Sequence, residues 1–237
     1  MNPLQRSKCW VAGVLFLAAA WAQQPPKPES NAQLEHVLSQ MDRMAANFHT
    51  TQASFVWDQY QKVVDETDTQ KGIIYFRRVG NETQMAADIS EPAPPKYVLF
   101  TDSKIQLFRP KIDQVDIYNA GKDRAAFESF LVLGFGGSGQ EMLKSFDVKF
   151  LGSEKVDNLD TAKLDLVPKS EKVRNTFNHI CLWIDPSRGV SVKQQLFAPG
   201  GDYRLAKYSD IRLNEKIPDA VFKLKTTSKT KIVSPQG

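Results

Sequence analysis

Few residues of this chain combine the types and spacing that catalysis requires. The 237-residue sequence has three histidines, His36, His49 and His179. None lies in an H-E-x-x-H pattern or beside a pair of cysteines, as zinc ligands commonly do. Ser138 lacks the G-x-S-x-G frame of a nucleophilic serine. We therefore predict that the protein is no enzyme and that it binds no metal and no cofactor.

A glycine cluster at residues 134–139 matches the pattern G-x-G-x-x-G through Gly134, Gly136 and Gly139. A dinucleotide site would need a strand before this pattern and a helix after it, within a parallel sheet. Here a segment with helical periodicity comes before the cluster. The glycines therefore indicate a hinge or a helix break rather than a nucleotide site.

The N-terminal residues 1–22 have the three parts of a secretory signal peptide. Arg6 and Lys8 form a positive region, an apolar run follows at residues 11–20, and Ala20-Trp21-Ala22 supplies small residues for cleavage. We predict a signal peptide at 1–22, a disordered Pro-rich leader at 23–30 and one domain at 31–237. The expected compartment is the bacterial periplasm.

The two cysteines fit this compartment without forming a disulfide. Cys9 precedes the apolar run, which is the wrong place for a lipid-modified cysteine, and it would leave with the signal peptide. Cys181 would then be the single cysteine of the mature chain, so no internal bridge is possible. It lies in an apolar strand pattern and is predicted to be a small buried hydrophobe.

The charge of the mature chain gives no reason to expect a nucleic-acid partner. Loss of Arg6 and Lys8 leaves 29 basic residues against 27 acidic residues, a net charge of +2. Binding to nucleic acid or strongly anionic surfaces usually needs a large basic excess. We expect a monomer that binds no nucleic acid.

The remaining pattern indicates a β-rich α+β protein. Apolar residues at helical spacing predict a helix from Ser30, with an S-x-x-Q capping box, to Phe48. Further helices are predicted at 123–133 and 141–146. Short strands joined by turn signals favour an antiparallel meander. The predicted strands are 53–64, 72–79, 84–89, 97–100, 105–108, 115–118, 146–151, 161–167, 177–184, 190–197, 203–213 and 221–224.

Several strands are apolar on both faces. Phe55 and Trp57 alternate with Val56, and Tyr75 alternates with Phe76. A sheet with one face in water would instead alternate between apolar and polar residues. Either both faces are covered, or one of them lines an apolar cavity.

The order of several short motifs resembles that of one protein family. A helix begins L-x-x-V-L at Leu34, and strand motifs A-x-F and G-x-x-Y-F-R-R follow at Ala53 and Gly72. The later motifs are V-L-F-T-D-S-K-I-Q-L-F from residue 98, F-L-V-L-G-F-G from 130, K-L-D-L-V-P-K from 163, D-x-x-x-G from 185 and I-P-D-A-V-F from 217. Over residues 31–225 the chain resembles the periplasmic outer-membrane lipoprotein carrier family, the LolA-type proteins.

This resemblance implies a half-open antiparallel β-barrel of about eleven strands, covered by helices that form a lid. It implies an apolar cavity for the acyl chains of lipoproteins. The expected lipid-binding residues are Phe55, Trp57, Tyr75, Phe76, Leu99, Phe100, Leu107, Phe127, Phe130 and Leu131. In the family an arginine on an early strand holds the lid, so Arg78 or Arg77 is expected to gate it, with Gly134 and Gly136 as the hinge.

The implied function is a periplasmic chaperone that carries lipoproteins toward the outer membrane. Its partners would be acylated lipoproteins, an inner-membrane transporter that releases them and an outer-membrane acceptor. Alternatives with the same fold are a membrane-anchored lipoprotein acceptor and an envelope-stress sensor. An enzyme is a further alternative, and turnover that depends on His179 or Ser138 would favour it.

Overall fold

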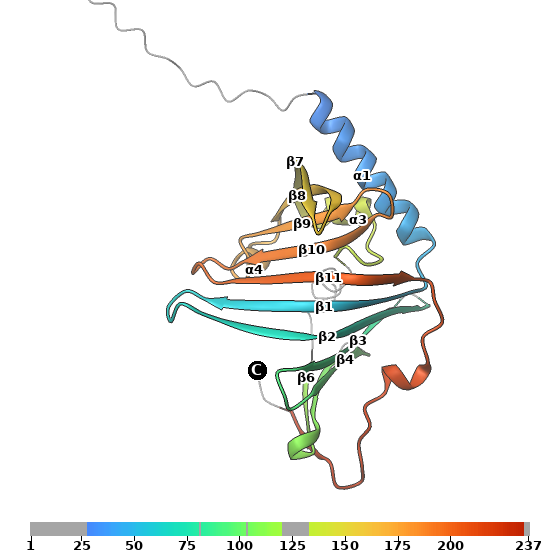
Figure 1. The fold of residues 1–237 in the computed structure, drawn as a ribbon, viewed down its shortest axis with the longest axis vertical. Helices are drawn as coiled ribbons and strands as arrows, with labels where there is room; N and C mark the ends of the chain where they lie inside the picture. Colours follow the sequence, from blue (N-terminus) through green and yellow to red (C-terminus); the bar gives the residue numbers. More distant parts are fainter. Residues whose placement is uncertain (1–27, 81, 103, 120–132, 235–237) are drawn as a thin grey trace, which may run out of the picture.

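One large sheet forms the body of the molecule (Figure 1). The computed structural model describes residues 28–80, 82–102, 104–119 and 133–234. Within them the sheet has 12 strands. In chain order these are β1 (Thr50–Gln61), β2 (Glu66–Val79), β3 (Glu82–Glu91), β4 (Lys96–Thr101), β5 (Lys104–Arg109), β6 (Gln114–Asn119), β7 (Phe146–Val156), β8 (Leu159–Pro168), β9 (His179–Asp185), β10 (Val190–Phe197), β11 (Tyr203–Leu213) and β12 (Lys231–Val233).

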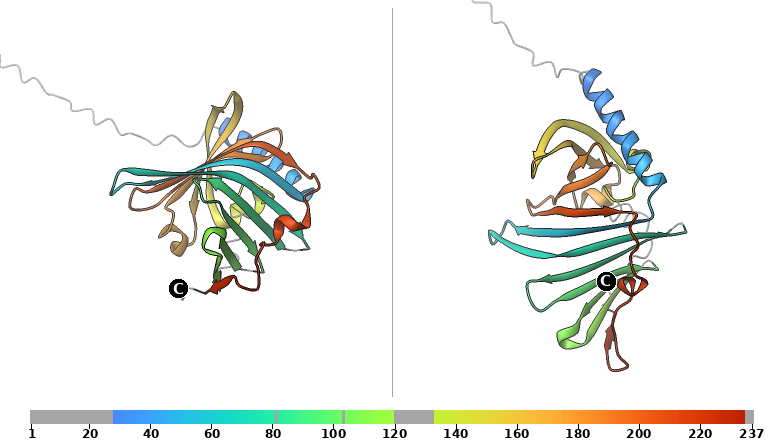
Figure 2. Two further views of the ribbon diagram at one scale, coloured as in Figure 1. Left: turned by 60° about the horizontal axis from the view of Figure 1, so that its bottom comes forward. Right: turned by 45° about the vertical axis from the view of Figure 1, so that its right-hand side comes forward.

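Two meanders meet in the middle of this sheet. The strand order is β12-β6-β5-β4-β3-β2-β1-β11-β10-β9-β8-β7, so β1 pairs with β11, which is far away in the sequence. All pairs are antiparallel except β12 with β6. The sheet curves but is not closed, since β12 and β7 are its two ends among the described residues (Figure 2). The predicted antiparallel, half-open architecture is confirmed at this level.

The C-terminal region differs from the prediction. Residues 221–224 are not a strand, because Asp219–Phe222 form the short 3-10 helix η3 directly after Pro218. Proline fixes φ near the helical value and so favours such a turn. The strand β12 follows instead and is only three residues long, too short to show a period in the sequence.

Few helices are present among the described residues. They are α1 (Pro28–Ala46), α3 (Gly139–Ser145), α4 (Glu171–Arg174), and the 3-10 turns η1 (Pro110–Ile112) and η3. Helix α1 begins at Pro28, so the predicted capping box at Ser30 is wrong and residues 28–30 of the predicted leader are helical. The rest of that leader, residues 23–27, lies outside the described residues. A proline is tolerated in the first helical turn, where its missing N–H has no partner to lose. No helix among the described residues is both long and apolar enough to cross a membrane.

Helices α1 and α3 cover the inner face of β7, β8 and β9, and we call this part of the molecule the closed half (Figure 1). Val37, Leu38 and Met41 of α1 pack there against strand residues that are fully buried. These strand residues are Leu164, Leu166, Ile180, Leu182 and Ile184, each 0% exposed. The two helices lie so close that a Cβ at Gly139 would come within 2.7 Å of the Leu38 carbonyl oxygen.

Strands β1 to β5 form the open half, and the segment around η3 covers part of their outer face, on β2, β3 and β4. Leu99 and Ala86 are buried there against Phe222, with Tyr75 packed beside them. Arg77 strengthens this contact, since its guanidinium lies 4.0 Å from the centre of the Phe222 ring. This contact explains why Tyr75 and Leu99 are apolar although they point outward.

Candidate functional site

An apolar cavity of about 670 Å³ lies on the inner face of the open half and continues onto β10 and β11. The apolar and aromatic residues that strands contribute to its wall are Phe55, Trp57, Ile74, Phe76, Met85, Ala87, Ile89, Val98, Ile105, Leu196, Ala206 and Tyr208, and Gln194 and Arg204 are polar residues of the same strands. Phe135 closes one end, and Val173 and Phe177, on and after α4, contribute at another. Cavities of this size and character are typical of sites for small apolar ligands.

The alternation of side chains along each strand produces this wall. Successive residues of a strand point to opposite faces, so Ile74 and Phe76 point inward while Tyr75 points outward. The same rule places Val98 in the wall and Leu99 on the outer face. In the open half one face lines a cavity and the other is covered, so both explanations of the two-sided strands apply.

The predicted lipid-binding residues therefore divide by face. Phe55, Trp57 and Phe76 are part of the cavity wall. Tyr75 and Leu99 face away from it. The prediction included residues of both strand faces without assigning one face to the cavity.

Two further predicted residues do not line the described cavity, and three others lie outside the described residues. Phe100 is on the same face of β4 as Val98 but is buried in a cluster with Phe76 and Phe135. Leu107 pairs with Val98 across β4 and β5 but is not part of the described wall. The predicted lid residues Phe127, Phe130 and Leu131 lie outside the described residues, as does most of the predicted helix 123–133.

Polar groups gather at one side of the cavity. Ser170, Lys172 and Thr176 line it around α4, and Arg204 lines it from β11. The Arg204 guanidinium lies 6.0 Å from the ring centre of Trp57, and it also contacts a second aromatic ring. Sequence reasoning missed Arg204, although its spacing of two and four residues from Ala206 and Tyr208 would have placed all three on one face of a strand.

A buried hydrogen-bond chain ties the cavity wall to the glycine-rich loop. The Gln194 amide donates to the Leu133 carbonyl at 2.5 Å, and the Tyr208 hydroxyl donates to the Gln194 side-chain oxygen at 3.4 Å. Burial raises the pKa of Tyr208. Phe135 packs edge-on against the Tyr208 ring, with ring centres 4.7 Å apart. The loop is thus fixed to β10 and β11 at this end of the cavity.

The two adjacent arginines of β2 point to opposite faces. Arg78 donates to the backbone carbonyl oxygens of Ala45, at 2.9 Å, and Gly136, at 3.0 Å. Arg77 instead donates to Gln84, at 2.7 Å, and to Asp219 of η3, at 2.6 Å. Only Arg78 therefore connects β2 to the end of α1 and to the glycine-rich loop, as a lid-holding arginine would.

Gly134 and Gly136 sit in tight, buried turns. Both have positive φ, of 81° and 87°, which other residues adopt only with strain. A Cβ at Gly136 would lie 2.7 Å from the Phe48 ring, and one at Gly134 would lie 2.3 Å from the Cβ of Ser191. In this structure the glycines allow close packing, and their role as a hinge stays a prediction.

The residues first considered for catalysis have other contacts. Ser138 is the N-cap of α3, and its hydroxyl oxygen accepts a hydrogen bond from the Glu141 backbone N–H at 3.0 Å. His179 stacks on Phe197 with ring centres 4.2 Å apart. The G-x-G-x-x-G pattern leads from a buried turn into α3 and follows no described strand.

Comparisons with known proteins establish the fold. No protein-family model matches the chain, and no curated protein matches it in sequence. Among solved structures, MucB aligns with a TM-score of 0.53 at 12% identity, over 85% of this chain and 66% of MucB. An uncharacterised conserved protein from Thermus thermophilus aligns with a TM-score of 0.53 at 9% identity, over 85% of this chain and 99% of its own.

A LolA superfamily protein from Nitrosomonas europaea is also matched, at 15% identity over 81% of this chain and 97% of its own. Its TM-score is 0.41. The two alignments with a TM-score above 0.5, to MucB and to the Thermus thermophilus protein, show that the chain shares their fold. At identities this low, the likeness concerns the fold alone.

Proposed function

We propose that the protein binds the acyl chains of lipoproteins in the cavity of the open half and carries them toward the outer membrane. One observation supports this above all: a cavity of about 670 Å³ whose strand-borne wall is almost wholly apolar. A cavity that is lined by apolar side chains binds an apolar ligand more favourably than it binds water.

The energetics of acyl chains explain why such a protein would be needed. Each buried methylene contributes roughly 0.8 kcal/mol, so a long acyl chain contributes on the order of 10 kcal/mol. A lipoprotein would not leave its membrane unless a carrier offered a comparable apolar environment. The cavity walls of β1 to β5 and β11 supply one.

The proposed setting follows from the sequence. A signal peptide at residues 1–22 would direct the chain to the periplasm, where an inner-membrane transporter would load it and an outer-membrane acceptor would unload it. Because the glycine cluster is not predicted to bind a nucleotide, we expect the transporter to supply the energy for loading. The mature protein would act as a monomer.

A bulky substitution inside the cavity tests this function. Ala206 lines the cavity, and the next residue, Lys207, is exposed and points to the other face of β11. Ala206→Trp should fill part of the cavity and weaken the binding of a fluorescent acyl probe about tenfold or more, equivalent to about 1.4 kcal/mol. Lys207→Trp adds the same side chain outside the cavity and should bind the probe normally.

Native mass spectrometry of protein purified from the periplasm then identifies the cargo. We expect acylated lipoprotein on the parent chain and on Lys207→Trp, and much less on Ala206→Trp. Equal loading of all three proteins would refute binding in this cavity. A diacylglyceryl mass attached covalently to the mature chain would instead indicate the membrane-anchored acceptor.

A further inference from the structure

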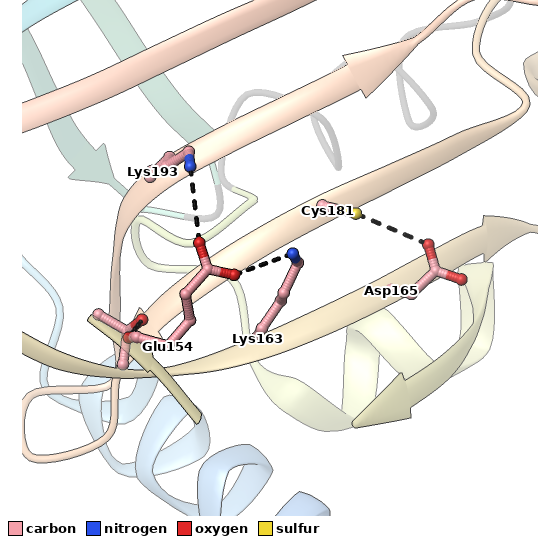
Figure 3. Close-up of polar contacts among 6 residues, drawn as sticks. Glu154, Lys163, Asp165, Cys181 and Lys193 are labelled. Carbon is pink, nitrogen blue, oxygen red and sulfur yellow. Dashed lines mark hydrogen bonds and ion pairs between the residues drawn. The ribbon is translucent and has the colours of Figure 1, made fainter. Parts of the chain in front are cut away.

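Three metal-ligating side chains converge on the outer face of β8 and β9, away from the cavity. Asp165 of β8 pairs directly with Cys181 of β9, and His179 lies two residues earlier on the same face of β9. One ligand atom from each lies within 4.8 Å of the others. The Cys181 Sγ and the Asp165 Oδ1 are 3.9 Å apart and face each other across the two strands (Figure 3).

The mixture of donor atoms indicates which ions would fit. A thiolate, an imidazole and a carboxylate together suit Zn²⁺ and neighbouring transition metals, whereas Mg²⁺ and Ca²⁺ prefer oxygen ligands alone. Three protein ligands leave a fourth, tetrahedral position for water or for a group from a partner. We propose that Asp165, His179 and Cys181 bind one Zn²⁺-class ion on the outer face of the sheet.

The positions of the ligands favour a preformed site. All three are on paired strands of one sheet, so the backbone fixes their spacing. The His179 ring is held by stacking on Phe197, with the ring planes 18° apart, and stacking occupies the ring face rather than its nitrogen atoms. Cys181 is buried, whereas Asp165 and His179 are half-buried and leave an approach from solvent.

The nearest cations are held by other groups. Lys163 lies two residues from Asp165, but its ammonium contacts the Glu154 carboxylate at 2.9 Å (Figure 3). Lys193 of β10 lies 3.9 Å from the same carboxylate. Both ammonium groups also lie over the Trp183 ring, at 4.8 and 4.0 Å from its centre. Glu154 and Trp183 thereby reduce the repulsion that a metal ion beside Cys181 would meet.

The sequence predicted no metal because His179 lies neither in an H-E-x-x-H pattern nor beside a pair of cysteines. The third ligand, Asp165, lies 16 residues from Cys181 and reaches it only through the pairing of β8 with β9. This inference does not depend on the proposed lipid-binding function, since the site faces away from the cavity.

Titration of the metal-free full chain with Co²⁺ tests the site directly. We expect one equivalent to bind with a thiolate-to-cobalt absorption band, and Zn²⁺ to abolish the band by displacement. Loss of even an outer-shell partner lowers metal affinity about 10–100-fold, so Cys181→Ser, Asp165→Asn and His179→Gln should each cost at least that much. His36→Gln on the exposed side of α1 is the matched control and should bind normally.

Thermal unfolding gives a second measurement. Zn²⁺ should raise the Tm of the parent chain and of His36→Gln, because a ligand that binds only the folded state stabilises it. The Tm of Cys181→Ser should not respond. No binding by the parent chain, or binding that survives Cys181→Ser, would overturn the proposal, and acyl-probe binding would remain intact in either case.

Discussion

The closed half and the open half of the sheet present the same kind of alternating strand to the inside of the molecule, but only the closed half is filled. In the closed half, Leu182 and Leu164 are fully buried beneath α1 and α3. In the open half, Val98 and Ile105 are only partly buried and line a cavity. Whether the inner face of a strand becomes part of the core or of a binding site therefore depends on the elements that cover it.

The difference separates the two tasks of the molecule. A filled half can contribute stability, because close-packed side chains gain both burial and dispersion contacts. An unfilled half contributes less but leaves apolar surface for a ligand. Substitutions in the two halves should therefore change different measurable properties.

The largest expected effect is a stability loss from truncation in the closed half. Leu182→Ala removes a fully buried side chain of β9 from the cluster that packs against α1, and such changes cost about 2–5 kcal/mol. Urea denaturation of the mature protein should show a lower midpoint with an unchanged slope. Binding of an acyl probe to the folded fraction should be unaltered.

The matched change in the open half is Ile105→Ala. Ile105 is partly buried and already borders the cavity, so its removal enlarges an existing space and should cost about 1 kcal/mol or less. It should alter probe affinity instead. Equal stability losses for Ile105→Ala and Leu182→Ala would show that the two halves are not packed differently.

Acid should weaken the closed half through Asp185 at the end of β9. Burial by itself would raise the pKa of this carboxyl, but hydrogen bonds from Ser187 and Arg188 outweigh it, so the pKa lies below its ordinary value. A depressed folded-state pKa stabilises the folded protein above the unfolded-state value of about 3.9. This stabilisation is lost as the pH falls through the folded-state pKa.

Two variants check the acid dependence. Asp185→Asn should lower the unfolding free energy near neutral pH by about 1.5–3 kcal/mol, the contribution of a hydrogen bond to a charged group, and should flatten the loss in acid. Glu141→Gln removes an exposed ion pair with Lys144, of a kind that contributes about 0–1 kcal/mol, and serves as the control. Identical acid profiles for Asp185→Asn and the parent would contradict this assignment.

Much of this architecture could be predicted from the sequence because strand periodicity is local. Eleven of the twelve predicted strands correspond to observed ones; 190–197 and 203–213 have the observed ends, and the ends of the others differ by up to six residues. The exception is 221–224, where Pro218 favours a 3-10 turn. A family resemblance was needed to predict an open barrel, because strand order depends on contacts between distant segments such as β1 and β11.

The candidate sites were harder to predict because they depend on register and pairing. Tyr75 and Phe76 are equally apolar, and a shift of one residue exchanges the faces they point to. Asp165 meets Cys181 only because β8 pairs with β9 in one particular register. By position the sequence leaves Arg78 and Arg77 both possible, and the acceptors of Arg78, the carbonyl oxygens of Ala45 and Gly136, become visible only in the structure.

Arg78 connects the two halves, so its removal should act mainly on the closure of the covering elements. It extends from β2 of the open half to the Ala45 carbonyl at the end of α1 and to the Gly136 carbonyl before α3. Hydrogen bonds from a charged donor contribute about 1.5–3 kcal/mol each, part of which solvent recovers when they open. Arg78 therefore links the covering elements to a cavity strand, and we call these two hydrogen bonds the latch.

We expect Arg78→Leu to shift this latch toward the open state about tenfold, which corresponds to about 1.4 kcal/mol. Amide hydrogens of residues 133–136 should exchange faster, and cargo should load normally but transfer slowly to an acceptor, because closure no longer competes with it. Arg77→Leu is the control: it breaks the contact with Asp219 on the other face and should leave loop exchange and transfer unchanged.

If Arg77→Leu slows transfer and Arg78→Leu does not, the closed state is held from the outer face by η3. If neither variant changes exchange or transfer, the two halves are not coupled through β2.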